Sequence, residues 1–222
     1  HISVLCQSFK LGNALKRGIP VAIVGETNAG KSTLLNALVG EERALVSNIH
    51  GTTRDTIEET VNIAGTLVRF IDTAGIRQTT DTIERMGIDR TYAKINEADI
   101  VLWLIDLTAY KEQFETLAQC ILPAAVGKQL VILLNKQDLV DSTTLSQATH
   151  YLNQKISTPS PTLLSMSAQS AEGLEQLHQI LVCTLSKLKT TTAPNGTIVS
   201  NLRHYEALSA AHVAIDRVSE GL

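Results

Sequence analysis

Four apolar runs of strand length alternate with segments of helical periodicity along the middle of the chain. The runs occupy residues 19–24, 67–71, 100–107 and 130–134, and each is apolar at most positions. Strands that are apolar on both faces are typical of a parallel sheet covered by helices on both sides. The pattern therefore predicts an α/β domain with a mainly parallel sheet whose four apolar strands are buried on both faces.

Two further segments predict strands of a different kind. Residues 56–63 alternate apolar and polar positions, and Ala64-Gly65 then leads into the run at 67–71 as the turn of a hairpin does. We expect this segment to be an antiparallel edge strand. Residues 162–166 form a short strand-like run near the end of the domain.

The two ends of the chain follow a separate pattern. Apolar residues lie at helical spacing in residues 2–9 and again in residues 202–215. Residues 189–196 read Lys-Thr-Thr-Thr-Ala-Pro-Asn-Gly, which is typical of a linker. Because the sequence begins within a helical pattern, we expect it to belong to a longer protein. The predicted parts are a helical segment at 1–17, a main domain at 18–188, and a linker with a second helical segment at 189–222.

Composition limits the classes of protein to consider. The chain has 222 residues, and 44% of them are hydrophobic. Its net charge of −3 argues against strong binding of a nucleic-acid backbone by the overall charge of the chain. The three cysteines, at positions 6, 120 and 183, are too far apart for a local metal-binding motif or a disulfide framework. No apolar run reaches the roughly 18 residues of a membrane span. These features predict a soluble, cytoplasmic protein with no membrane partner.

A phosphate-binding motif follows the first apolar strand. Residues 25–32 read Gly-Glu-Thr-Asn-Ala-Gly-Lys-Ser, and apolar residues at helical spacing come after them. Glycines allow successive N–H groups to curl around a phosphate, and the start of the helix adds the positive end of its dipole. Lys31 would contact the terminal phosphates, and the Ser32 hydroxyl would bind magnesium. The residues predicted to bind the nucleoside triphosphate here are Asn28, Ala29, Gly30, Lys31, Ser32 and Thr33.

Two polar segments predict the rest of the magnesium site. Residues 51–55, Gly-Thr-Thr-Arg-Asp, lie where a segment that is ordered by the terminal phosphate would belong, and we expect Thr53 to supply a second hydroxyl to the magnesium. Asp72-Thr73-Ala74-Gly75 follows the strand at 67–71, at the end where sheets of this kind bind ligands. Asp72 would hold magnesium through water, and the Gly75 N–H would bind a terminal phosphate.

The identity of the nucleotide's base is predicted by the motif Asn135-Lys136-Gln137-Asp138, which follows the strand at 130–134. An ionised carboxylate only accepts hydrogen bonds, so Asp138 suits the two adjacent N–H donors on the edge of guanine, whereas adenine places an acceptor there. Asn135 and Lys136 are expected to bind the nucleotide with it. Ser167-Ala168 would donate a backbone N–H to the guanine carbonyl. The predicted ligands are therefore GTP and GDP.

Together these motifs resemble the translation-factor-like GTPases, and within them the G domain of the MnmE (TrmE) family of tRNA-modification GTPases. The resemblance also rests on Ile76-Arg77, on residues 83–88, and on Asn201-Leu202-Arg203-His204-Tyr205. It implies a Ras-like P-loop GTPase domain with a mixed, mostly parallel six-stranded sheet, flanked by pieces of a separate helical domain. It also implies a G-domain dimer and, through the full-length protein, a flavoprotein partner of the MnmG type and tRNA.

The resemblance further implies how GTP is hydrolysed. The residue after Gly75 is Ile76, which cannot polarise water, and the family suggests Glu84 as the group that orients the attacking water, beside Thr53 and Gly75. From the sequence alone, Glu84 fits equally well as an ordinary acid in the first turn of a helix. The family also implies a potassium ion, whose ligands would be Asn28, Ser47, Ile49 and Thr52.

The sequence thus predicts a potassium-stimulated GTPase domain of a protein that modifies the wobble uridine of tRNA. Two alternatives stay open. A ribosome-assembly GTPase of the Der or Era type shares the motifs at 51–55 and 72–75, although residues 201–205 and the acidic balance point away from it. A nucleotide-gated binding module would bind GTP with little hydrolysis, and only a turnover measurement separates it from an enzyme.

Overall fold

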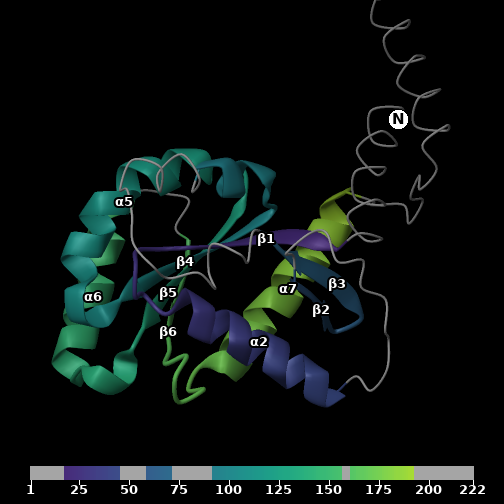
Figure 1. Cartoon of the computed structure of the whole chain (residues 1–222). Coiled ribbons are helices and arrows are strands. Elements are labelled where there is room, and N and C mark those ends of the chain that lie inside the picture. Colours follow the sequence, from purple (N-terminus) through teal and green to yellow (C-terminus); the bar gives the residue numbers. More distant parts are fainter. Residues whose placement is uncertain (1–17, 46–58, 72–91, 157–160, 193–222) are drawn as a thin grey trace, which may run out of the picture.

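A single six-stranded sheet organises the part of the chain that the computed structural model describes, residues 18–45, 59–71, 92–156 and 161–192 (Figure 1). The strands lie in the order β2-β3-β1-β4-β5-β6. All neighbouring strands are parallel except β2 and β3, so the predicted mixed, mostly parallel sheet is confirmed. The strands are β1 (Ile19–Val24), β2 (Glu59–Ile63), β3 (Thr66–Phe70), β4 (Ile100–Asp106), β5 (Gln129–Asn135) and β6 (Thr162–Ser165).

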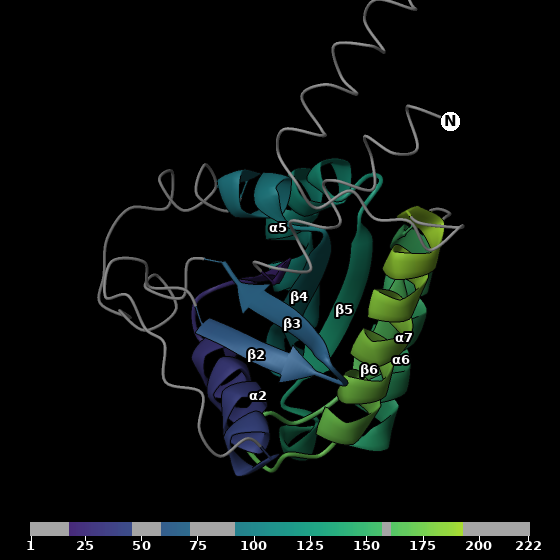
Figure 2. The ribbon, with the colours of Figure 1, turned by 90° about the vertical axis from the view of Figure 1, so that its right-hand side faces the viewer.

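The hairpin between β2 and β3 forms one edge of the sheet (Figure 2). Its turn consists of Ala64 and Gly65, which have φ angles of 48° and 76°. Two successive residues with positive φ match the right-handed twist of the flanking strands, which lets Ile63 pair directly with Thr66. The predicted antiparallel edge strand is confirmed within the described residues 59–63.

Four helices with both ends inside the described residues cover the sheet, two on each face (Figures 1 and 2), and residues 92–97 are helical as well. Alternate residues of a strand point to opposite faces, so Val21 and Ile23 of β1 pack toward one helix layer while Ala22 and Val24 pack toward the other. None of the helices within the described ranges is long and apolar enough to cross a membrane. The helices are α2 (Lys31–Leu45), α5 (Tyr110–Ala124), α6 (Ser142–Lys155) and α7 (Leu174–Thr192).

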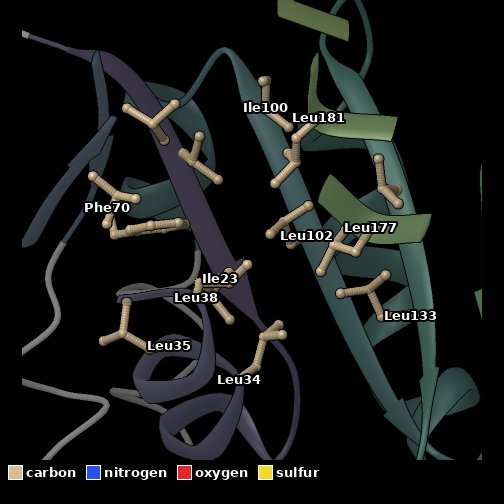
Figure 3. Close-up of a cluster of buried hydrophobic side chains, with 14 of the residues drawn as sticks. Ile23, Leu34, Leu35, Leu38, Phe70, Ile100, Leu102, Leu133, Leu177 and Leu181 are labelled. Atoms are coloured by element: carbon tan, nitrogen blue, oxygen red, sulfur yellow. The ribbon is translucent and has the colours of Figure 1, made fainter. Parts of the chain in front are cut away.

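Helices α2 and α7 bury their apolar stripes on the same face of the sheet (Figure 3). Leucines recur at helical spacing on both helices and meet branched side chains from β1, β3, β4 and β5, as the pattern of a helix packed on a sheet requires. This layer positions the start of α2, which contains the last two residues of the phosphate-binding motif. Its fully buried members include Ile23, Leu34, Leu35, Phe70, Ile100, Leu102, Leu133, Leu177 and Leu181.

Helices α5 and α6 cover the opposite face. Trp103 of β4 is fully buried there and stacks on Phe114 of α5, with ring centroids 5.4 Å apart. Leu152 of α6 belongs to the same cluster. The apolar faces of β4 and β5 are therefore buried on both sides, as predicted for these two strands.

Strand β3 differs from the prediction that it is buried on both faces. Its residues Val68 and Phe70 are buried, but Leu67 and Arg69 are only half-buried. Arg69 donates to the exposed carboxylate of Glu97, with 3.2 Å between Nη2 and Oε1. The second face of β3 thus carries a polar contact, because the strand lies next to the edge of the sheet.

The ends of the predicted domain arrangement fall largely outside the described residues. Segments 1–17 and 193–222 cannot be compared with the predicted helical pieces for this reason. Helix α7 continues to Thr192, so the first four residues of the predicted linker at 189–196 are helical.

The carboxyl ends of β1, β4, β5 and β6 all lie at one edge of the sheet, which we call the carboxyl edge. Four connections within the described residues leave from it, and three of them carry predicted site residues. Ligands bind at this edge in open parallel sheets, because the connecting segments converge there. The connections are residues 25–30, the 3₁₀ turn η1 (Leu107–Ala109), residues 136–141 with the 3₁₀ turn η2 (Gln137–Leu139), and residues 166–173.

Candidate nucleotide-binding site

The phosphate-binding motif forms a tight connection between β1 and α2. A Cβ atom on Gly25 would lie 2.4 Å from the carbonyl oxygen of Leu104, and one on Gly30 would lie 2.2 Å from Nδ2 of Asn135. Real Cβ atoms do not approach other atoms so closely, and both glycines also have positive φ angles, of 147° and 101°. The loop therefore requires glycine at both positions, because its backbone packs directly against β4 and β5.

Helix α2 begins at Lys31, immediately after this loop. The first turn of an α-helix leaves N–H groups without partners inside the helix, and its dipole makes this end positive. Ser32 is half-buried and Thr33 is exposed in that turn. The arrangement is the anion-binding geometry that the motif predicts.

The Lys31 side chain folds back across the loop. Its ammonium donates to the carbonyl oxygens of Gly25, at 2.9 Å, and Glu26, at 2.5 Å. Burial and, to a lesser degree, the positive charge of Lys94 lower the pKa of Lys31 to about 8, although the carboxylate of Glu26 partly offsets both effects. A negative charge beside Lys31 would favour its charged form, so the position is suited to a phosphate.

Asn135, the last residue of β5, joins the phosphate loop to the loop after β6. Its Nδ2 donates to the carbonyl oxygen of Ala29 at 2.7 Å, and its Oδ1 accepts from the Ala168 N–H at 2.9 Å. The residue is 2% exposed, so both bonds form away from water. Only an amide offers a donor and an acceptor in this geometry; a carboxylate could not donate. Asn135 therefore brings three predicted motifs together.

The loop after β6 is held by backbone hydrogen bonds, one within the loop and one from the segment after β5. The Ser167 N–H donates to the Glu172 carbonyl at 2.9 Å, and the Met166 carbonyl accepts from the Gln137 N–H at 3.1 Å. The N–H groups of both Ser167 and Ala168 thus have partners within the protein. A guanine carbonyl bound by these two residues, as the sequence predicts, would share or replace one of those bonds.

Asp138 lies in η2, on the rim of the carboxyl edge. Its side chain is exposed, and the preceding residue Gln137 is tied to the loop after β6 by the bond to Met166. An exposed carboxylate on a fixed turn is free to accept hydrogen bonds from a ligand. The segments that carry Asp138 and Ser167 are therefore adjacent, as base recognition requires.

Asp106 is a residue of this edge that the sequence motifs do not include. It ends β4, is 6% exposed, and pairs in register with Asn135. Its Oδ2 lies 2.5 Å from the ammonium of Lys136, while its Oδ1 accepts from the N–H and the hydroxyl of Thr108. Burial raises the pKa of the Asp106 carboxyl, but the bonds from Lys136 and Thr108 outweigh it and hold the pKa below its usual value. A charged residue at the end of an otherwise apolar strand is the sequence signal that marks it.

Seven of the predicted site residues lie outside the part of the chain that the structure describes. Of the predicted magnesium and potassium ligands, Ser32 and Asn28 are described. Asn28 has a φ of 64°, a left-handed conformation that asparagine adopts more readily than most residues. The residues outside are Ser47, Ile49, Thr52, Thr53, Asp72, Gly75 and Glu84.

Comparison with known proteins gives a consistent result. Residues 20–136 match the family described as 50S ribosome-binding GTPase. Two relatives, each named tRNA modification GTPase MnmE, match 100% of the chain: one from Bacteroides fragilis (strain YCH46) at 49% identity and one from Phocaeicola vulgatus at 50%. The chain covers 47% and 43% of these proteins, so it spans about half the length of the curated relatives that it matches.

A solved structure also resembles this fold. Era in complex with MgGDPNP and part of 16S ribosomal RNA superposes with a TM-score of 0.56 and 26% identity. The match covers 74% of this chain and 56% of the Era chain. The sheet and the carboxyl edge are therefore those of a P-loop GTPase fold.

The buried amide of Asn135 is expected to be a main support of this edge. Replacing it by alanine leaves the Ala29 carbonyl and the Ala168 N–H without their partner, which should lower the free energy of unfolding by about 1–3 kcal/mol. Urea unfolding of Asn135→Ala measures this change. The matched control is Asn96→Ala, whose exposed side chain should contribute within about 0.5 kcal/mol. Equal losses in the two variants would contradict the role given to Asn135.

Proposed function

Because the chain belongs to the GTPase family described as 50S ribosome-binding GTPase, and matches tRNA modification GTPases along its whole length, we propose that it binds and hydrolyses GTP within a protein that modifies the wobble uridine of tRNA. The hydrolysis is proposed to be potassium-stimulated and to involve a dimer of G domains. The chain covers about half of these relatives, and the tRNA chemistry is proposed for the complete protein.

The observation that carries the GTP assignment is the double hydrogen bond of Asn135. It fixes the phosphate loop against the loop after β6, and its neighbours in sequence lead to the exposed carboxylate of Asp138. A triphosphate on the loop would therefore have its base next to an acceptor-only group. Guanine presents two adjacent N–H donors to such a group and adenine does not, which supports GTP over ATP.

Magnesium fits the oxygen donors that the chain offers. It prefers hydroxyl and carboxylate ligands, and the Ser32 hydroxyl stands in the first turn of α2, next to the lysine that folds over the loop. Thr53 and Asp72 are the other ligands that we propose. Bound magnesium would neutralise charge that develops on the phosphate oxygens. The roles left to the chain are to hold the phosphates with Lys31 and with the Gly75 N–H.

Hydrolysis also requires an oriented water. We assign this task to Glu84, since the residue after Gly75 is the apolar Ile76. Potassium is proposed to stand where other GTPases insert an arginine, and it would add positive charge near the leaving phosphate. Asn28 lies in the phosphate loop with a left-handed backbone. We propose that its side-chain amide oxygen is one of the potassium ligands. The other ligands that we propose are Ser47, Ile49 and Thr52.

The names of the relatives support tRNA as a partner, and the other partners are part of the same proposal. The proposed partners are a second G domain, a flavoprotein of the MnmG type and tRNA, the last two through the complete protein. A cytoplasmic location is part of the same proposal. The Era-type alternative is less well supported, because the likeness to Era is 26% in identity against 49% for the tRNA modification GTPase from Bacteroides fragilis.

Turnover in two salts tests hydrolysis. We expect the 222-residue chain to release phosphate from GTP at least about tenfold faster in potassium chloride than in sodium chloride at equal ionic strength, because the potassium ion supplies charge stabilisation. Phosphate release at saturating GTP measures the rates. Glu84→Ala should lose turnover in both salts while it still binds GTP. Equal, negligible rates for the unchanged chain would instead favour the nucleotide-gated binding module.

Guanine selectivity should depend on Asp138. In Asp138→Asn the side chain offers one donor and one acceptor, so we expect GTP affinity to fall at least about 100-fold and xanthosine triphosphate, which has a carbonyl in place of the amino group, to be preferred. Competition titrations with GTP, ATP and xanthosine triphosphate measure this. Asp141→Asn, which alters an exposed carboxylate that caps α6 through Thr144, should keep the preference for GTP. Unchanged selectivity in Asp138→Asn would refute the assignment.

The affinity for GTP should fall as the pH rises above about 8. The pKa of Lys31 without nucleotide is about 8, below its ordinary value because of burial and Lys94. A bound triphosphate favours the ammonium and so raises this pKa, which means that binding takes up a proton in the window above 8. The expected slope is up to about tenfold in affinity per pH unit, measured by calorimetry in buffers of different ionisation enthalpy.

The control for this pH dependence is Lys31→Arg. A guanidinium stays protonated throughout the window, so proton uptake and the slope should both disappear. The same slope in Lys31→Arg would show that another group is responsible.

A further inference from the structure

Asp106 is a buried carboxylate at the carboxyl edge for which the motifs of the GTPase family give no role. It stands directly beside Asn135 in the pairing of β4 with β5, and its partner is the next residue, Lys136. Its side chain is 9% exposed, whereas that of Lys136 is 30% exposed. The ion pair therefore joins the end of β4 to the segment that leads to the base-reading Asp138.

The two carboxylate oxygens of Asp106 have separate tasks. Oδ1 accepts from the N–H of Thr108 at 2.9 Å and from its hydroxyl at 2.7 Å, which caps η1. Oδ2 binds the ammonium of Lys136 at 2.5 Å. The Asp106 N–H donates to Oε1 of Gln113, which is buried in α5. Asp106 is thus fixed from both sides, and one of its oxygens is committed to Lys136.

Lys136 needs such a constraint because of its backbone. Its φ of 65° places it in the left-handed region, which costs a residue with a Cβ free energy and aims its side chain differently from its neighbours. A long lysine side chain also loses considerable rotamer freedom when it is held in one orientation. The ion pair with Asp106 supplies the interaction that selects this orientation.

The pair differs from ion pairs on the surface of the same fold. Arg69 with Glu97 and Lys155 with Glu115 join carboxylates that are 53% and 55% exposed. Exposed pairs of this kind contribute little, because water screens them. The Asp106 carboxylate is shielded and accepts three hydrogen bonds, so its geometry is fixed before any ligand arrives.

We propose that Asp106 is a positioning residue for the guanine nucleotide: by binding the Lys136 ammonium, it holds the base-reading segment in the conformation that accepts the base. This inference rests on the proposed GTP binding. Since GTP and GDP carry the same base, Asp106 affects both equally and has no part in the chemical step.

The test is Asp106→Asn, which removes one of the two tasks. The amide oxygen still caps Thr108, but an NH₂ group replaces Oδ2 and cannot accept from an ammonium. The affinities for GTP and GDP should both fall about tenfold, and KM should rise by the same factor while kcat at saturating GTP is retained. Fluorescent-nucleotide titration and phosphate release on the full 222-residue chain measure these values.

Two controls separate the ion pair from the cap. Thr108→Val removes one bond to Oδ1 and leaves Oδ2 with Lys136. Asp141→Asn changes a capping aspartate whose side chain accepts from the Thr144 N–H and has no lysine partner among the described residues. Both should bind GTP as the unchanged chain does. If Thr108→Val lowers affinity as much as Asp106→Asn, Asp106 acts by supporting η1, and the inference is overturned.

A double-mutant cycle tests whether Asp106 acts through Lys136. In a Lys136→Met background, Asp106→Asn should cause no further loss of GTP affinity, since the partner is already absent. A further tenfold loss would overturn the inference. If Asp106→Asn does not fold, Thr108→Val and Lys136→Met carry the test: GTP affinity kept in Thr108→Val and lost in Lys136→Met supports the positioning role, and affinity kept in both or lost in both refutes it. Failure of the unchanged chain to bind GTP would refute the proposed function itself, not this step.

Discussion

One buried amide, that of Asn135, connects the parts of the carboxyl edge that are far apart in sequence. It donates to the loop that follows β1 and accepts from the loop that follows β6, at 2% exposure. Both bonds must form or two buried backbone groups are left without partners. The same contact explains why residue 30 is glycine, because a Cβ there would lie 2.2 Å from the Asn135 amide nitrogen. Side chain and backbone are therefore fixed together at this point.

This arrangement couples the two ends of the proposed nucleotide site. Asn135 holds the phosphate loop, and Lys136 in the next position is held by Asp106 from the neighbouring strand. Because β4 and β5 pair in register up to their last residues, the two contacts stand side by side. A shift of β5 against β4 would break both. The register of two apolar strands, which are buried on both faces, thus determines the geometry of a polar site.

The sequence predicted the strands and the motifs well, because both depend on local patterns. The apolar runs gave β1, β4 and β5 with bounds that differ from the structure by at most one residue, and Ala64-Gly65 gave the hairpin. It did not predict the half-buried face of β3, nor Asp106 as the partner of Lys136. It also gave no sign that the N–H groups of Ser167 and Ala168 are already bonded. These features depend on which strands are neighbours and in which register, and no local pattern encodes that.

Lys31 shows how the phosphate loop is prepared for an anion. Its ammonium is bonded to two carbonyl oxygens of the loop, yet burial and Lys94 bring its pKa down to about 8. The two carbonyl oxygens therefore only partly compensate the positive charge of the buried Lys31 ammonium. A phosphate supplies the missing negative charge, and the start of α2 favours it for the same reason. The two hydrogen bonds of Asn135 hold the phosphate loop in place. An anion that binds there therefore gains the full interaction with the partly uncompensated charge of Lys31.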